Sequence, residues 1–484
     1  MSSTASDATK ASRAPGSRPP GWFDRWFQIT ARGTTPLREV RGGLTTFMAM
    51  SYIIVLNPLI LTGAHDINGQ RLSLIGVTTM TAFSAFVATV VMGAIGRVPL
   101  ALAAALTVNA VVAYQIAPQV TWPQAMGLVV IQGLVIVALA ASGVRTRIMN
   151  AIPRDLKHAI GVGLGLFIAL IGLVNAGFVT RRPDAAHTTV PVVLGDGGVL
   201  KGWPIVVFVV GLVLMIALWS RKVPGAVLLS IVVATVLGIV IETVAHVGAG
   251  WGLVTPSVPD KVAQLPDFSL FGQVDVVGAV THIGLVSLVV FVFTLVLSGF
   301  FDAMGTVIAV SDEAGLVDSN GNMPGIGRVL SIDGAAATFG GLTSSSANTV
   351  FVESAAGVGD GARTGLASVV TGGMFGVAMF LAPLATVIPQ QAAAPALVLV
   401  GGLMCAQARN IDWKNTEIAI PAFLILAITP FTYSVTSGVG AGVIAYVVIK
   451  AVNGKWRQPG WLLWIVSVVF VAYFGIYALE TIAK

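Results

Sequence analysis

Asp302 is the single ionisable residue between Ile283 and Val310, in a run otherwise typical of a membrane helix (IGLVSLVVFVFTLVLSGFFDAMGTVIAV). A carboxylate near the bilayer centre costs about 2.5–3.5 kcal/mol on insertion scales, so such a residue is a functional candidate by default. The chain becomes polar again at Asp312, about 15 Å further along a helix, which is half the hydrocarbon thickness. We therefore predict a functional carboxylate. The alternative is a protonated Asp that hydrogen-bonds a neighbouring helix.

Glu353 and Asn109 are two further polar residues within apolar segments. Glu353 follows a polar stretch, Thr343 to Asn348, and is expected at the start of a short helix, where amide N–H groups and the helix dipole favour an anion. A simple first-turn helix cap is the alternative. Asn109 lies in LTVNAVVAY and offers donor and acceptor groups in an apolar setting. Its alternative is an interhelical hydrogen bond.

Two carboxylates and an amide together suit a planar heterocycle that carries N–H donors, because these groups read such edges through paired hydrogen bonds. A buried carboxylate can also carry a coupling proton. The sequence shows no HExxH, GxSxG or phosphate-binding loop, and its five histidines have no metal-ligand spacing. We therefore expect no enzyme, no catalytic residue, no metal and no cofactor.

The composition indicates a membrane protein. Of the 484 residues, 56% are hydrophobic and only 10% are charged, with a mean hydropathy of +0.89, whereas soluble domains carry about a quarter of their residues as charges. Apolar runs of about 17–25 residues recur along the chain and predict an all-α polytopic membrane protein. The net charge of +6 comes from basic residues at segment ends, so it does not indicate a nucleic-acid partner.

The apolar runs form two series of seven, which predicts about 14 transmembrane segments. An odd number per half places the halves in opposite orientations, as an inverted repeat, in which the third helix of each half is often short and broken. Here the third and tenth segments (98–118 and 340–361) are the least helix-like and include strand-like stretches. The predicted organisation is a disordered tail (1–20), an interfacial segment (21–38), a first repeat (39–247), a connecting loop outside the cytoplasm (248–279), a second repeat (280–453) and a C-terminal hydrophobic segment (454–484). The sequence does not decide whether the apolar run 461–479 in this last segment spans the membrane.

The Lys/Arg distribution predicts a cytoplasmic N-terminus. Basic residues are concentrated in the N-terminal tail, after the fourth segment and after the sixth, and the acidic central loop then lies outside. Arg181 and Arg182 are an exception. The basic residues that predict this orientation are Arg25, Arg32, Arg38, Arg41, Arg145, Arg147, Arg154, Lys157, Arg221 and Lys222.

Several motifs resemble one known family. The stretch RGTTPLREVRGGLTTFMAMSYIIVLNP (32–58), FFDAMGT (300–306), VFVESAAGVGDGARTGLASVVTG (350–372) and PALVLVGGLM (395–404) are similar to the AzgA-like purine permeases of the nucleobase–cation symporter-2 superfamily. The resemblance implies fourteen helices with core and gate domains, and import of guanine, hypoxanthine or adenine, generally with protons. It also implies that the substrate-binding residues of the third, eighth and tenth helices are Asn109, Asp302 and Glu353, and that a homodimer is one possible assembly.

Two positions depart from the family pattern. A second Asp usually precedes the aromatic pair of the eighth helix, and this chain has Gly299 there. A glycine-rich stretch usually precedes the third-helix Asn, and this chain instead reads Ala103-Ala104-Ala105-Leu106-Thr107-Val108. We expect the alanines to stiffen the third segment, because Ala favours helix where Gly loosens it.

The sequence thus predicts a multi-pass permease of the plasma membrane that imports a purine nucleobase by alternating access. We expect the substrate to contact Asp302, Glu353 and Asn109, with Gly305, Thr306 and Ser354 as further lining, and Asp302 or Glu353 to carry the proton. The sequence does not decide which purine is preferred, or whether the coupling ion is a proton or a sodium ion. A same-fold permease for another nucleobase or an anion, an intramembrane enzyme and an inactive homologue also stay open.

Overall fold

Helices make up most of the computed structural model, which describes residues 21–142, 153–180, 192–317 and 323–482. The tail predicted to be disordered (1–20) lies outside the described residues, as do Arg145, Arg147, Arg181 and Arg182. In the first half the elements are α1 (Trp22–Phe27), α2 (Pro36–Met50), α3 (Ile53–Thr62), α4 (Leu74–Val91), β1 (Leu102–Ala104), α5 (Leu106–Val111), α6 (Trp122–Ser142), α8 (Arg154–Asn175), β2 (Val179–Thr180), β3 (Val193–Leu194), α9 (Trp203–Ser220) and α10 (Ala226–Ala245).

In the second half the elements are α11 (Val276–His282), α12 (Leu285–Glu313), α13 (Ile326–Leu342), β4 (Asn348–Val350), α14 (Ser354–Gly359), α15 (Gly365–Ala378), α16 (Gln390–Cys405), α17 (Thr416–Phe431), α18 (Val435–Val452) and α19 (Gly460–Ile482). Within the described ranges, nine helical stretches are long and apolar enough to cross a membrane.

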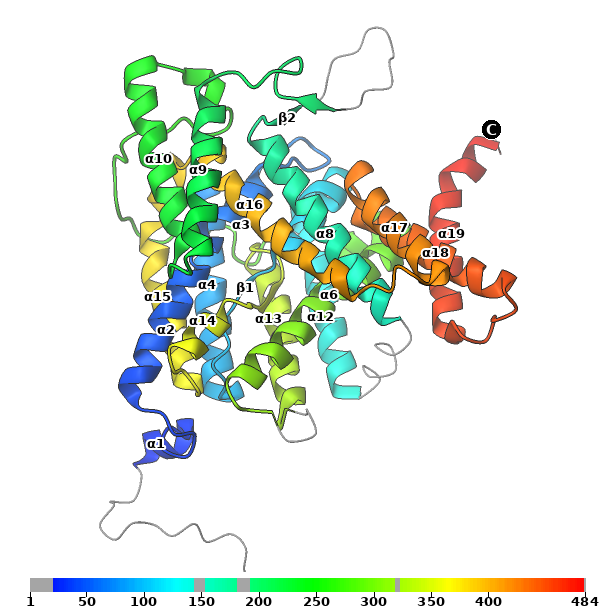
Figure 1. The fold of residues 1–484 in the computed structure, drawn as a ribbon, viewed down its shortest axis with the longest axis horizontal. Helices are drawn as coiled ribbons and strands as arrows, with labels where there is room; N and C mark the ends of the chain where they lie inside the picture. The colour runs from blue at the N-terminus through cyan, green and yellow to red at the C-terminus, as the bar shows by residue number, and fades with distance from the viewer. Residues whose placement is uncertain (1–20, 143–152, 181–191, 318–322, 483–484) are drawn as a thin grey trace, which may run out of the picture.

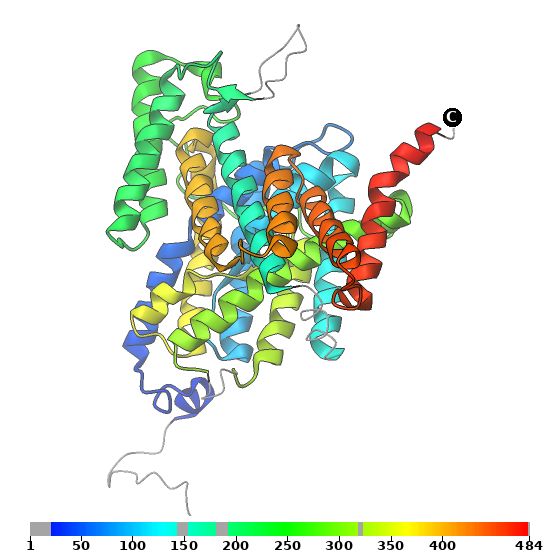
Figure 2. The same cartoon turned by 45° about the vertical axis from the view of Figure 1, so that its right-hand side comes forward.

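The packing contacts divide many of the helices labelled in Figure 1 into two groups. In the first group, which also holds β1 and β4, α15 packs against α2 and α4, and α13 packs against α6. In the second group α16 packs against α8 and α9, and α17 packs against α8 and α18. The paired helices α9 and α10 stand at one side of the molecule, and α19 lies at the opposite edge against α18 and α12 (Figure 2).

Strands β1 and β4 pair antiparallel within the first group, with Leu102 opposite Val350 and Ala104 opposite Asn348. Each strand leads into a six-residue helix, β1 into α5 and β4 into α14. Ala103 and Ala104, which we expected to stiffen a helix, form strand β1 and are completely buried. Pairing with β4 overrides their helix propensity, and their small side chains fit the crowded centre of the group.

Candidate functional site

The antiparallel pair of β1 and β4, called the strand crossing below, is a nonhelical part of the first group. Two further backbone bonds extend it, from Ala105 N to Ala347 O at 2.8 Å and from Phe351 N to Ala101 O at 2.9 Å. Nonhelical backbone at membrane depth needs such partners, because lipid offers none. The crossing therefore holds the starts of two short helices, α5 and α14, in fixed positions.

Hydroxyl groups on α4 support the crossing. The Thr89 hydroxyl bonds the backbone of Leu102, donating to its carbonyl at 2.8 Å and accepting from its N–H at 2.9 Å. One turn earlier, the Ser84 hydroxyl donates to Oδ1 of Asn348 at 2.8 Å. The polar stretch Thr343–Asn348, which the sequence analysis identified, is buried in protein.

Glu353 is the N-cap residue of α14, yet its side chain does not cap that helix. Its Oε1 accepts a hydrogen bond of 2.6 Å from the hydroxyl of Tyr52. Ser354, the next residue, is completely buried, and its hydroxyl accepts from Ala101 N at 3.0 Å. Glu353 is thus held by a neighbouring element, whereas Ser354 serves the strand crossing.

Asp302 and Gly305 lie in α12, but the position of the Asp302 side chain and the burial of both residues fall outside what the structure describes. Thr306, in the same helix, is buried. Helix α12 packs against both α5 and α14, so the backbone brings the third, eighth and tenth predicted segments together. The substrate and proton roles of Asp302, Glu353, Asn109 and Thr306 stay predictions.

Asn109 lies in α5, and both its amide atoms are buried without a hydrogen-bond partner among the described residues. The same is true of Thr107 Oγ1 in α5, Ser298 Oγ in α12 and Gln132 Oε1 in α6. About nine in ten buried polar groups in proteins are paired. Unpaired atoms on three adjoining helices are therefore available to a bound molecule.

Asp333 and Gln132 are two buried polar residues that the sequence reasoning missed. Oδ1 of Asp333, in α13, accepts from Thr349 Oγ1 at 3.1 Å and from Val350 N at 3.2 Å, which ties α13 to β4. The signal for Asp333 was present, since it is the one ionisable residue after Arg328 in an otherwise apolar and small-residue helix. For Gln132, the sequence shows only a polar residue in a long apolar run.

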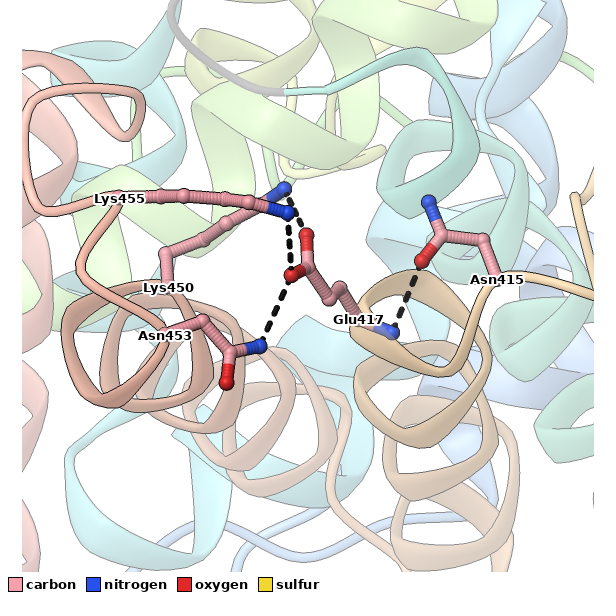
Figure 3. A network of polar contacts seen from close by, with 5 residues as sticks. All are labelled: Asn415, Glu417, Lys450, Asn453 and Lys455. Atoms are coloured by element: carbon pink, nitrogen blue, oxygen red, sulfur yellow. Dashed lines mark hydrogen bonds and ion pairs between the residues drawn. The ribbon is translucent and has the colours of Figure 1, made fainter.

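A separate ionic cluster joins α17 to α18 at one end of the second group (Figure 3). Glu417 contacts Lys450 Nζ at 2.5 Å and Lys455 Nζ at 2.7 Å, and accepts from Asn453 Nδ2 at 2.8 Å. The Lys450 side chain is 9% exposed, so Glu417 neutralises a cation that is almost removed from solvent. Within the described ranges, no group of three or more His, Cys, Asp or Glu side chains is placed to hold a metal ion.

The chain matches known proteins over nearly its whole length. The family described as "Permease family" matches residues 37–449. Guanine/hypoxanthine permease PbuG of Bacillus subtilis is 34% identical over 93% of this chain and 98% of its own length. Guanine/hypoxanthine permease GhxP of Escherichia coli O157:H7 is 32% identical (95% and 98%), and adenine permease AdeQ of Escherichia coli K12 is 34% identical (93% and 95%).

Solved structures show the same fold at low sequence identity. The transmembrane domain of the cyanobacterial bicarbonate transporter BicA has a TM-score of 0.60 at 16% identity, and covers 84% of this chain and 97% of its own. Murine Slc26a9, an anion transporter in the inward-facing state, has a TM-score of 0.59 at 12% identity (91% and 74%). At these identities the similarity concerns the fold alone.

Proposed function

The chain belongs to the permease family and is a multi-pass membrane transporter rather than an enzyme, and on that premise we propose that it imports purine nucleobases by proton symport. The observation that carries this proposal is the full-length similarity to proteins named guanine/hypoxanthine and adenine permeases, at 32–34% identity. The buried, unpaired atoms of Asn109 and its neighbours support a polar substrate site beside the strand crossing.

The substrate lies between α5, α12 and α14 in this proposal. Asn109 supplies an amide, and Glu353 and Asp302 supply carboxylates that accept N–H groups of the base. Gly305, Thr306 and Ser354 complete the lining. Ser354 acts there by holding the strand crossing, through its hydrogen bond with Ala101 N. The proton resides on Asp302 or Glu353, so that protonation and substrate binding change together.

Alternating access follows from movement of one helix group against the other. The first group carries the site, and the second forms the opposite wall, as a core and a gate within a fourteen-segment inverted repeat. Substrate and proton shift the equilibrium between the two facing states only through different affinities for them. In this proposal the N-terminus is cytoplasmic, the membrane is the plasma membrane, and a homodimer is one possible assembly.

Uptake into proteoliposomes tests this function. Full-length protein, reconstituted with an inward proton gradient, should accumulate labelled guanine, hypoxanthine or adenine unchanged, and an uncoupler should abolish accumulation. Glu353→Gln should abolish accumulation while purine counterflow continues, because exchange needs no net proton movement. Uptake of a pyrimidine, xanthine or bicarbonate in preference to these purines would refute the substrate, and full accumulation by Glu353→Gln would refute its coupling role.

A further inference from the structure

Gln132 lies in α6 against α12 and is completely buried. Its Nε2 donates to the carbonyl oxygen of Leu295, in α12, at 2.9 Å. Because a carbonyl can only accept, this bond identifies the NH2 end of the side-chain amide and leaves Oε1 as its acceptor. Oε1 is buried and has no partner in the described part of the chain. Such an acceptor is unfavourable unless a bound molecule donates to it.

Gly299 makes room for this amide. A Cβ atom at residue 299 would lie 2.8 Å from Nε2 of Gln132, closer than real Cβ atoms approach a neighbour. The side chain of a helical residue covers the turn before it, and here that turn carries the carbonyl of Leu295. A side chain at residue 299 would therefore force the amide of Gln132 to shift from this position.

The amide borders a narrow pocket beside the paired strands, which has no room for a water molecule in this structure, so a ligand reaches it only when the surrounding helices move apart. Gln132 and Gly299 line this pocket together with Val108, Asn348 and Thr349. Val108 directly precedes Asn109, whose own amide atoms are unpaired. Gln132 therefore lines a pocket together with a residue of α5, the helix that carries Asn109.

We propose that Gln132 is a specificity-determining residue whose Oε1 accepts a hydrogen bond from one ring N–H of the purine, and that Gly299 is required to seat it. This inference rests on the proposed function and names one contact of the same site. The bond to Leu295 fixes the orientation of the amide. It therefore selects a base with an N–H at that edge and disfavours a base with a lone pair or a methyl group there.

Competition in proteoliposomes tests the contact. The probe is the labelled purine that the full-length protein takes up best, and the competitors are that purine and its derivatives methylated at each ring nitrogen in turn. With the native protein, one derivative should compete at least about tenfold less well than the parent. In Gln132→Ala, which removes the acceptor and opens space, this ratio should fall to about threefold or less.

Gln391→Ala is the matched control. Gln391, in α16, also donates through Nε2 to a backbone carbonyl, that of Trp251, and also has a buried Oε1 without a described partner. Its loss should leave the competition ratio unchanged. An unchanged ratio in Gln132→Ala, in protein that elutes as a single peak and transports, would overturn the inference. Absence of purine uptake by the native protein would instead overturn the proposed function, and this contact with it.

Gly299→Ala tests the seating and serves if Gln132→Ala fails to fold. The added Cβ should raise the KM for the purine about fivefold to tenfold in the native background. In a Gln132→Met background, where no amide remains to be displaced, the same substitution should change KM less than about twofold. Equal effects of Gly299→Ala in both backgrounds would show that the two residues act independently.

Discussion

The hydroxyl of Tyr52 donates a hydrogen bond of 2.6 Å to Oε1 of Glu353, across 301 residues of sequence. Both residues stand at breaks between helices, Tyr52 as the N-cap of α3 and Glu353 as the N-cap of α14. The bond thus fixes the predicted coupling carboxylate from the first membrane segment of the chain.

Tyr52→Phe should lower purine kcat/KM about tenfold while the protein still folds. The substitution keeps the ring and removes one hydrogen bond to a charged group, a contact of about 1.5–3 kcal/mol. Initial uptake rates over a range of purine concentrations measure the effect. Tyr446→Phe is the control, because Tyr446 lies in α18, outside the proposed site. Native kinetics in Tyr52→Phe would show that this bond does not position Glu353.

Thr436→Val should loosen a contact between the two helix groups. Oε1 of Gln115, which follows α5, accepts from Thr436 Oγ1, at the start of α18, at 3.1 Å. Valine has the same shape but cannot donate, so the state in which these groups are apart becomes more populated. Labelling of Ser434→Cys by an impermeant maleimide, in a Cys405→Ala background, should become faster.

Thr432→Val provides the comparison for this measurement, because the hydroxyl of Thr432, the C-cap residue of α17, donates to Ile428 O of the same helix at 2.7 Å. With Thr432→Val added to the Ser434→Cys, Cys405→Ala protein, the labelling rate of residue 434 should equal that of the same protein without Thr432→Val. Equal rates in Thr436→Val and the parent would mean that the Gln115 contact does not restrain opening.

Glu39→Ala should destabilise the fold by roughly 1–3 kcal/mol. Glu39, in α2, is completely buried and accepts from three backbone N–H groups at the start of α15. Removal of the carboxylate leaves these three N–H groups without their acceptor, whereas Glu39→Gln keeps one acceptor oxygen. Thermal unfolding in detergent should therefore rank the native protein above Glu39→Gln and Glu39→Gln above Glu39→Ala. Equal Tm values for the two variants would contradict this role.

Glu417→Ala should lower Tm more than Arg41→Ala. The first substitution leaves the buried ammonium of Lys450 without its carboxylate, which is strongly unfavourable (Figure 3). The second breaks the pair between Arg41 and Asp360, in which the Arg41 side chain is 70% exposed, and such surface pairs contribute little. The reverse order of Tm values would show that the Glu417 cluster is not a stabilising element.

The sequence predicted a helical, multi-pass membrane protein, because recurring apolar runs of spanning length follow directly from the thickness of a bilayer. It also predicted which two segments are broken, since a polar run such as Thr343–Asn348 cannot be exposed to lipid. Glu353 at the start of a short helix followed from the same pattern, and the structure places it there. The fourteen-segment repeat and the role of Asp302 stay predictions.

Buried polar residues inside apolar helices were harder to interpret. Gln132 and Glu39 have no local signature, because the rotation of the helix and the neighbour that it meets decide whether a polar side chain is structural or available. Helix propensity was misleading at Ala103 and Ala104, because the partner strand β4 lies about 245 residues away in the sequence.

The order of apolar and polar residues along the chain was enough to determine the membrane class and the cost of placing Asp302 and Glu353 among apolar neighbours. Only the tertiary structure decided that Tyr52 holds Glu353, that Gly299 admits the amide of Gln132, and that β1 pairs with β4. Each of these contacts joins residues far apart in the chain, so its geometry depends on how whole helices pack.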